Sequence, residues 1–262
     1  MVATNWILLP FAGLFAGLLA GLFGIGGGTV LVPILVGLGY PYNQAIATSS
    51  LAIVITALSG TLQNWRMGFL QPKNIILLGL PAIATAQIGV YLVGQLPTYL
   101  KEGAFGVLLI VTIFLGMLRK RLRDTSETTS FHREGIKPLI FRLITGGLAG
   151  LLAGLFGVGG GVIMVPLQML LLGETIKTAI QTSLGVIVIT SIAACIGHAL
   201  ENNVLLLPGI FLGVGGLLGA RISTRYLPKL PDRVVNLCFR TLLAILAIYF
   251  FWRSGMSLKD VQ

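Results

Sequence analysis

The chain has 262 residues, of which 55% are hydrophobic and 10% are charged, and its net charge is +10. Soluble domains usually carry about 25% charged residues, so the composition argues against a soluble fold. The basic residues lie in loops, where they set orientation and meet anionic lipid headgroups, so nucleic acid is not expected as a partner. Charge-free runs cover everything before Arg66, and then 74–100, 103–118, 143–173, 178–200 and 202–220. Several reach the roughly 20 residues with which a helix crosses a bilayer. The sequence therefore predicts a polytopic, all-α membrane protein, and we expect it in the inner (plasma) membrane.

The predicted elements form two similar series. Within residues 1–123 they are a Gly- and Leu-rich helix, a glycine turn, a short apolar helix and three longer spans, at 6–23, 24–28, 29–39, 44–63, 74–95 and 102–119. A polar linker at 124–137 follows. Within residues 138–262 the same order recurs, at 139–156, 157–161, 162–172, 178–199, 203–222 and 233–252. A hydropathy count would give about eight hydrophobic segments.

An internal duplication accounts for the two series. The stretch Leu18–Gly24 recurs without a change at Leu151–Gly157, an offset of 133 residues. After one extra residue the offset is 134, which pairs Ala45–Ser49 with Ala179–Ser183. Both first helices carry a glycine at every fourth position, which allows close helix packing in a membrane and indicates no chemistry. These glycines are Gly13, Gly17 and Gly21, then Gly146, Gly150 and Gly154.

The distribution of basic residues selects between two topologies. If each short helix continued the first one, each half would make four crossings and the 18 Lys and Arg residues would divide more evenly between the two sides. If each glycine turn is instead the tip of a hairpin, each half makes three full crossings and only Lys101, Arg253 and Lys259 lie outside. Basic residues favour the cytoplasm, so we predict two inverted repeats, a plan common in transporters. The linker and the loop at 221–233 would be cytoplasmic, and both termini periplasmic.

The two glycine turns are the first candidate binding site. Four glycines in five residues free the backbone to leave helical angles, and such a break in a bilayer is tolerated only where protein or a water-filled cavity satisfies the amides. The short helices that follow would present N–H groups and positive dipole ends to an anion. The alternative is a structural bend for close packing. The predicted substrate-binding residues here are Gly26, Gly27, Gly28, Thr29, Gly159, Gly160 and Gly161.

Polar side chains on the long spans complete the predicted site. Hydroxyls suit an oxyanion because they donate a hydrogen bond without a fixed charge, although capping and interhelical bonding are the alternative. Those at the starts of two spans are Thr48, Ser49, Ser50, Thr182 and Ser183. Asn64 and His198 occupy equivalent positions at the far ends of these spans. A histidine can titrate near neutrality, so His198 is a candidate for proton coupling, with a satisfied interface residue as the alternative.

The sequence contains no catalytic or metal-binding motif. All eight acidic residues lie in linkers or at span ends, and Cys195 and Cys238 show no partner spacing. HExxH, GxSxG and Cys/His clusters are absent. We therefore expect neither an enzyme nor a bound metal or cofactor, and an intramembrane enzyme is the weakest alternative.

The doubled GLFGxGGG…P motif, followed in each half by an A…TS segment, resembles the sulfite exporter TauE/SafE family, also called TSUP permeases. The resemblance covers nearly the whole chain. It implies a membrane transporter associated with export or uptake of sulfite, sulfoacetate and other small sulfur-containing or organic anions. Many members carry a His-x-x-x-Gly pattern after the second long span. Here Asn64 replaces the histidine in one half and Asn202 replaces the glycine in the other, which departs from a two-histidine mechanism.

Together these features predict a secondary transporter that holds a small anion near the midplane between the two glycine turns and moves it by alternating access. Its partners would be the substrate anion and the lipid bilayer, while a coupling proton or cation and a homo-oligomeric state stay open. A passive anion channel and a membrane scaffold subunit of a sulfur-metabolism complex are the alternatives.

Overall fold

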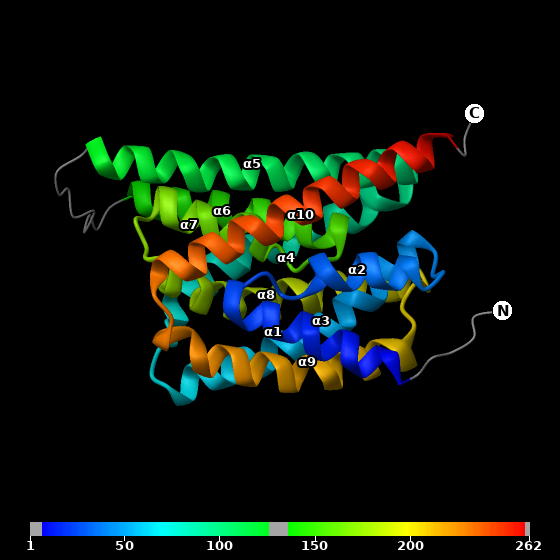
Figure 1. Ribbon diagram of the computed structural model, residues 1–262, viewed down its shortest axis with the longest axis horizontal. Coiled ribbons are helices and arrows are strands. Elements are labelled where there is room, and N and C mark those ends of the chain that lie inside the picture. Colours follow the sequence, from blue (N-terminus) through cyan, green and yellow to red (C-terminus); the bar gives the residue numbers. More distant parts are fainter. Residues whose placement is uncertain (1–6, 126–135, 260–262) are drawn as a thin grey trace.

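The computed structural model describes residues 7–125 and 136–259, and every regular element in these two segments is helical (Figure 1). The predicted all-helical membrane class is thus confirmed, while most of the predicted linker 124–137 lies outside the described residues. The elements are α1 (Leu8–Phe23), α2 (Gly28–Gly37), α3 (Tyr42–Arg66), α4 (Pro72–Gln95), α5 (Thr98–Thr125), α6 (Ile136–Phe156), α7 (Gly161–Leu171), α8 (Ile176–Leu200), α9 (Leu206–Tyr226), the 3₁₀ turn η1 (Leu227–Lys229) and α10 (Asp232–Lys259).

Seven helices of the described segments are long and apolar enough to cross a bilayer, namely α3, α4, α5, α6, α8, α9 and α10. The short helices α2 and α7 have 10 and 11 residues. At 1.5 Å per residue they extend only about 15 Å, roughly half of a 30 Å hydrocarbon core. Neither can cross the membrane by itself, so each begins inside the bundle, at its buried glycine turn.

Each short helix follows a break at a glycine turn. In the first turn, Gly24, Gly26 and Gly27 have φ values of 65°, 76° and 87°. In the second, Gly157, Gly159 and Gly160 have φ values of 63°, 74° and 77°. Residues with a Cβ are strained in this left-handed region, whereas glycine is not. The chain reverses at both turns, so α1 with α2 and α6 with α7 form two hairpins whose tips meet inside the bundle (Figure 1).

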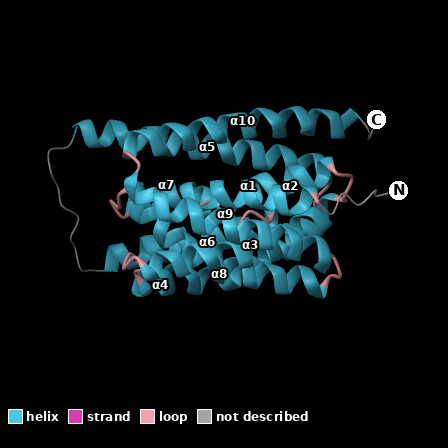
Figure 2. Ribbon diagram, turned by 60° about the horizontal axis from the view of Figure 1, so that its bottom comes forward, coloured by secondary structure: helices cyan, strands magenta, loops and turns pink. Residues whose placement is uncertain are grey.

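Corresponding helices of the two halves run in opposite directions. In Figure 1, α5 starts at the end of the bundle where N and C are marked, whereas α10 ends there. The α3–α4, α7–α8 and α9–α10 connections lie at the opposite end, which we call the linker end because α5 finishes and α6 begins there. Figure 2 shows the same separation from another side. Inverted halves would have this arrangement, and their relation to the two sides of a membrane stays a prediction.

The first helix of each half packs against the other half. α1 lies along α9, and its counterpart α6 lies along α4. A Cβ atom on Gly17 would overlap the backbone of Gly216, and one on Gly150 would overlap the backbone of Ala82. The helices therefore touch through their main chains at both places, which confirms the packing role expected of the glycine stripes. The two halves have exchanged their first helices in the same register.

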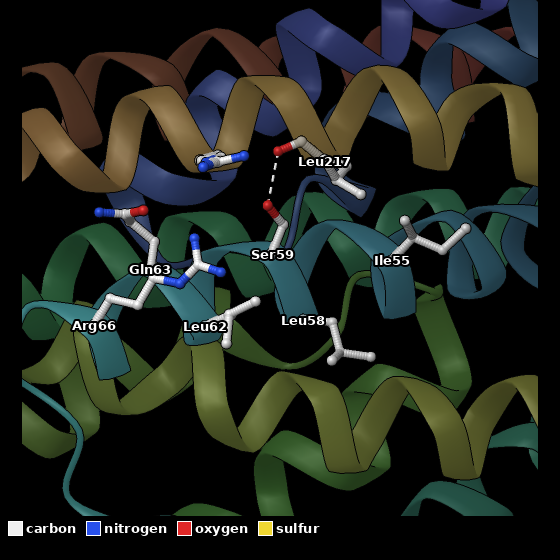
Figure 3. A pocket seen from close by; sticks show the side chains of 8 residues that line it. Ile55, Leu58, Ser59, Leu62, Gln63, Arg66 and Leu217 are labelled. Atoms are coloured by element: carbon white, nitrogen blue, oxygen red, sulfur yellow. Dashed lines mark hydrogen bonds between the residues drawn. The ribbon is translucent and has the colours of Figure 1, made fainter.

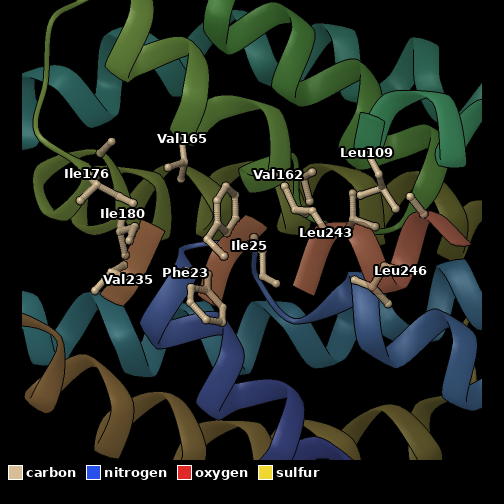
Figure 4. Close-up of a cluster of buried hydrophobic side chains, with 14 of the residues drawn as sticks. Phe23, Ile25, Leu109, Val162, Val165, Ile176, Ile180, Val235, Leu243 and Leu246 are labelled. Carbon is tan, nitrogen blue, oxygen red and sulfur yellow. The ribbon is translucent and has the colours of Figure 1, made fainter. Parts of the chain in front are cut away.

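The largest buried cluster covers one side of the hairpin tips (Figure 4). Phe23 and Phe156, the last residues of α1 and α6, pack here with Ile25 of the first turn against α5 and α10. The ring of Phe105 in α5 lies 4.9 Å from that of Phe156 and 4.5 Å from that of Phe250. Because α5 and α10 also pack on each other, this pair closes the bundle over the two breaks.

A partly buried ion pair joins α5 to α10 near the end opposite the linker end. The carboxylate of Glu102 is fully buried and binds the Arg253 guanidinium, and it accepts a second hydrogen bond of 2.7 Å from Ser257 Oγ. Glu102 lies four residues into the span that starts at Thr98, in agreement with the predicted position of acidic residues at span ends. The predicted loop at 221–233 is mainly helical, because α9 continues to Tyr226 and η1 follows directly.

The first prediction concerns topology. In a cysteine-free background, Asn203→Cys and Gly39→Cys should react from outside intact cells with a membrane-impermeant maleimide. Phe69→Cys and Lys229→Cys, at the linker end, should react only after permeabilisation, because basic residues concentrate there and favour the cytoplasm. The readout is gel-shift labelling of each variant. Labelling of Lys229→Cys in intact cells would contradict this orientation.

Candidate functional site

The two glycine turns lie side by side at the centre of the bundle. A Cβ atom on Gly28 would overlap the carbonyl of Gly157, and a Cβ atom on Gly161 would overlap the carbonyl of Gly24. Every residue from Gly24 to Gly28 and from Gly157 to Gly161 is buried. The structure thus brings together the glycines predicted from both halves, at one place rather than two.

Two serines from the long spans hold the turns by an exchange between halves. Ser49 Oγ on α3 donates to the Gly157 carbonyl at 2.9 Å, and Ser183 Oγ on α8 donates to the Gly24 carbonyl at 3.0 Å. Each hydroxyl also lies 2.8 Å from a carbonyl of its own helix. A serine hydroxyl has one hydrogen to donate, and in this arrangement it is directed at backbone. Direct substrate contact by Ser49 and Ser183 stays a prediction.

The backbone amides of the turns are buried donors without a protein acceptor. Within the described chain, no hydrogen bond is made by the N–H groups of Ile25, Gly26 and Gly27, or by those of Val158, Gly159 and Gly160. Buried N–H groups are nearly always paired with protein, water or a ligand. These six lie at the N-termini of α2 and α7, where the positive ends of the helix dipoles favour an anion.

The remaining predicted hydroxyls differ in their bonding. Thr29 at the start of α2 and Thr182 on α8 are buried, and their hydroxyl oxygens have no hydrogen-bond partner. Ser50 donates to the Ile46 carbonyl of its own helix, and Thr48 accepts the amide of Leu205 at 3.1 Å. Thr29 and Thr182 are therefore the two predicted hydroxyls without any hydrogen-bond partner.

One residue that supports the second turn was not among the predicted site residues. Thr190 Oγ1 donates to the Gly159 carbonyl at 2.9 Å, from two turns further along α8 than Ser183. The 134-residue offset pairs Thr190 with Thr56, whose hydroxyl donates instead to Ala52 of its own helix. The paired threonines were a signal in the sequence, but only the contact identifies the member that binds a turn.

Asn64 and His198 lie far along their helices from the serines that hold the turns. Each lies 15 residues beyond the serine of its own helix, about 22 Å along the axis. His198 Nε2 bonds the Gly154 carbonyl at 3.1 Å, which ties it to α6 one turn before the glycine break. Asn64 is fully buried and neither its amide nitrogen nor its amide oxygen has a hydrogen-bond partner. The structure places the equivalent residues in different environments.

The His-x-x-x-Gly departure noted in the sequence has a backbone consequence. Gly68 and Asn202, each four residues after Asn64 and His198, have φ values of 75° and 57°. Asn202 is the one non-glycine residue with positive φ in the described segments. Asparagine tolerates this region better than most residues, so the helix end keeps its geometry without glycine.

Glu174 is a partly buried carboxylic acid at the linker end. It lies in the connection between α7 and α8, where Asn74 Nδ2 is 3.4 Å from its Oε1. Burial raises the pKa of the Glu174 carboxyl to about 7, although the nearby positive charge of Arg142 opposes the shift. The sequence showed only an acidic residue at a span end, since burial depends on how the hairpin packs.

The space between the turns is filled by protein in this conformation. Ile53 on α3 and Ile187 on α8 approach the turns from the two long spans, and a Cβ atom on Gly26 would lie 3.2 Å from both. Among the described residues there is no group of three His, Cys, Asp or Glu side chains that could hold a metal ion. The site therefore offers neutral donors and helix dipoles, and an anion would reach them only after the two turns separate.

Comparison with known proteins agrees with this architecture. The profile of the family described as "Sulfite exporter TauE/SafE" matches residues 9–250. "Probable membrane transporter protein YunE" of Bacillus subtilis (strain 168) is 26% identical, over 97% of this chain and 100% of the relative. A "Probable membrane transporter protein" of Xylella fastidiosa (strain Temecula1 / ATCC 700964) is 28% identical, over 98% and 99%. "Probable membrane transporter protein y4hK" of Sinorhizobium fredii (strain NBRC 101917 / NGR234) is 30% identical, over 82% and 89%.

Because the family profile covers the chain from α1 to α10, including both glycine turns, this multi-pass membrane protein belongs to the TauE/SafE sulfite exporter family of transporters.

Proposed function

We propose that the protein is a secondary transporter of a small anion in the inner (plasma) membrane and that it binds its substrate on the amides of the two glycine turns. The substrate would be sulfite, sulfoacetate or another small sulfur-containing or organic anion. The observation that carries the proposal is the set of six buried N–H groups of both turns that have no acceptor in the described chain. Family membership supports transport as the activity.

Neutral donors suit an anion that must bind and leave again. Backbone N–H groups at a helix N-terminus favour a negative charge without a permanent counter-ion. Two such termini, from α2 and α7, meet at one place here. The hydroxyls of Thr29 and Thr182 are unpaired and buried, and they would add two further donors. Sulfite and sulfonate oxygens accept several hydrogen bonds at once, so a set of convergent donors would match them.

Alternating access would separate groups of helices that differ from the two sequence halves. α1 and α3 both pack on α9, whereas α6 and α8 both pack on α4. The two groups meet where α3 lies against α8 and where the turns touch. We propose that they rock against each other about this contact, which would open the turns first to one side and then to the other. Transporters built from inverted repeats commonly move in this way.

The alternatives make different predictions for flux. A coupled transporter gives saturable uptake against a gradient, whereas a passive anion channel gives flux only down the gradient. A scaffold subunit of a sulfur-metabolism complex would co-purify with an enzyme. Uptake of labelled sulfite into proteoliposomes, with and without an imposed pH gradient, separates the three. Absence of saturable anion flux in folded protein would count against the transport proposal.

The glycine turn can be tested with a matched pair of variants. Gly27→Ala places a Cβ atom 3.1 Å from the Ala16 carbonyl oxygen at a φ of +87°. Gly39→Ala introduces similar strain at a φ of +91°, but with nothing within 4 Å. Both should lose about 1 kcal/mol of stability or more. Only Gly27→Ala should also weaken anion binding, by about tenfold. Relaxation of the strained backbone would turn an amide away from the anion, which costs about as much as one hydrogen bond to a charged group.

Melting temperature and anion affinity, measured on both variants, decide between binding and bending. Equal affinity in Gly27→Ala and Gly39→Ala would mean that the turn serves packing alone. Gly160 is the counterpart of Gly27 in the second half, but Gly160→Ala is less suitable for measuring anion binding. Its Cβ atom would overlap the backbone carbonyl of Ala149, so we expect it to fold poorly.

The serines give a second test. Ser49→Ala with Ser183→Ala should lower the free energy of unfolding by about 1–3 kcal/mol per site, because a buried carbonyl in each turn loses its donor. Ser50→Ala is the matched control, since its hydroxyl bonds only within its own helix. Thermal unfolding and isothermal titration with sulfite provide the two readouts. Unchanged stability with tenfold weaker binding would show that the serines contact the anion instead of the turns.

The Glu174 carboxyl predicts a pH dependence. Its pKa is about 7 in the folded protein against 4.5 for the ordinary group, so the folded state binds more protons between these values. Stability should therefore fall as pH rises from about 4.5 to about 7 and change no further above that range. In Glu174→Gln this part of the melting-temperature profile should be flat. A variant profile identical to that of the wild type would exclude Glu174 as the titrating group.

A further inference from the structure

A groove runs between α3 and α9 at the linker end of the bundle. It encloses about 410 Å³ and has two kinds of lining. Leu58, Leu62 and Leu217 line its apolar part, and Gln63, Arg66 and Arg221 line its polar part. Figure 3 shows Leu58, Leu62 and Arg66 following one another along α3, with Leu217 across the groove on α9. The groove is separate from the glycine turns.

The apolar part of the groove faces outward from the bundle. Leu58, Leu62 and Leu217 are 49%, 40% and 37% exposed, although they belong to helices that cross the membrane. Such side chains contact acyl chains in a bilayer. Ser59, which lies between them, donates its hydroxyl to the Leu217 carbonyl at 2.8 Å and so presents no free donor. An acyl chain is the natural occupant of this part.

The polar part carries two positive charges without a carboxylate. The ion pairs within the described segments are Lys177 with Asp232 and Arg253 with Glu102, and neither Arg66 nor Arg221 takes part in them. A guanidinium binds a phosphate through two parallel hydrogen bonds. Two guanidiniums and the Gln63 amide at the mouth of one groove therefore match an anionic headgroup above an acyl chain.

The repeat provides an internal control for this charge. The 134-residue offset places Leu200 opposite Arg66 and Gln87 opposite Arg221. Gln87 donates to the Ala193 carbonyl at 2.6 Å, so even its amide is used within the protein. The equivalent face at the other end of the bundle carries no charge. The arginines are exposed and thus not needed for packing, and they occur only at the end that we predict to be cytoplasmic.

From these observations we infer that the α3–α9 groove binds an anionic phospholipid, with its headgroup phosphate on Arg66 and Arg221 and an acyl chain along Leu58, Leu62 and Leu217. Basic pockets between transmembrane helices on the cytoplasmic side recognise anionic headgroups by this combination. The bound lipid would bridge α3 and α9 and stabilise their contact. The inference does not depend on which anion the protein transports.

Native mass spectrometry of the full-length protein, with phosphatidylglycerol or phosphatidylcholine added to the detergent, tests the site. The wild type should retain phosphatidylglycerol in preference to phosphatidylcholine. Arg66→Gln with Arg221→Gln should weaken this binding at least about tenfold, because charge-assisted hydrogen bonds are lost. Lys73→Gln with Arg233→Gln is the matched control. It removes the same charge from exposed residues at the same end, and it should change binding less than about twofold.

Two further arms identify the source of the anion. Inorganic phosphate and sulfite at millimolar concentration should not displace the lipid, because they lack an acyl chain. Leu58→Asn with Leu62→Asn should weaken binding of a long-chain phosphatidylglycerol more than that of a dihexanoyl analogue. Circular dichroism checks folding of each variant. Equal losses in both charge variants, or displacement by the free anions, would overturn a specific lipid site.

Discussion

The constraint on which the structure depends is the hydrogen bonding of broken backbone inside a membrane. Carbonyl and N–H groups that leave a helix in hydrocarbon must be satisfied by protein or by a water-filled cavity. This protein breaks two helices and satisfies part of each break from the opposite half, through the bonds from Ser49 to Gly157 and from Ser183 to Gly24. Each turn thus receives a donor from the opposite half, and the second turn receives another from Thr190 of its own half. The serines thereby bind the carbonyls of Gly157 and Gly24. The N–H groups of the same two peptide bonds belong to Val158 and Ile25 and have no acceptor in the described chain.

The glycine stripes make this exchange possible. Because α1 and α6 meet their neighbours α9 and α4 through main-chain contact, each hairpin can insert deeply into the opposite half. Side chains larger than hydrogen at Gly17 or Gly150 would push these helices apart and move the turns out of reach of the serines. Close packing of α1 and α6 is therefore a condition for the proposed anion site, because it sets the position of the two glycine turns.

Charge plays a separate role from this central machinery. The turns are neutral, and the fixed charges lie towards the helix ends, where Glu102 and Arg253 join α5 to α10. At the linker end, Arg66 and Arg221 have no ionic partner within the described chain. The protein thus separates a neutral interior, which holds the proposed anion site, from charged helix ends.

The sequence by itself determined the helical membrane class, the duplication and the two glycine breaks, because long apolar runs and clustered glycines have few physical solutions in a bilayer. It also placed helix starts such as Tyr42 and Asp232 within two residues of the predicted spans. Only the tertiary structure decided that the serines point at carbonyls, that Thr190 supports one turn, that Asn64 lacks a side-chain partner and that Glu174 is partly buried. Those properties depend on which half each hairpin enters, and the local sequence of a repeat is the same whether the halves pack separately or exchange their first helices.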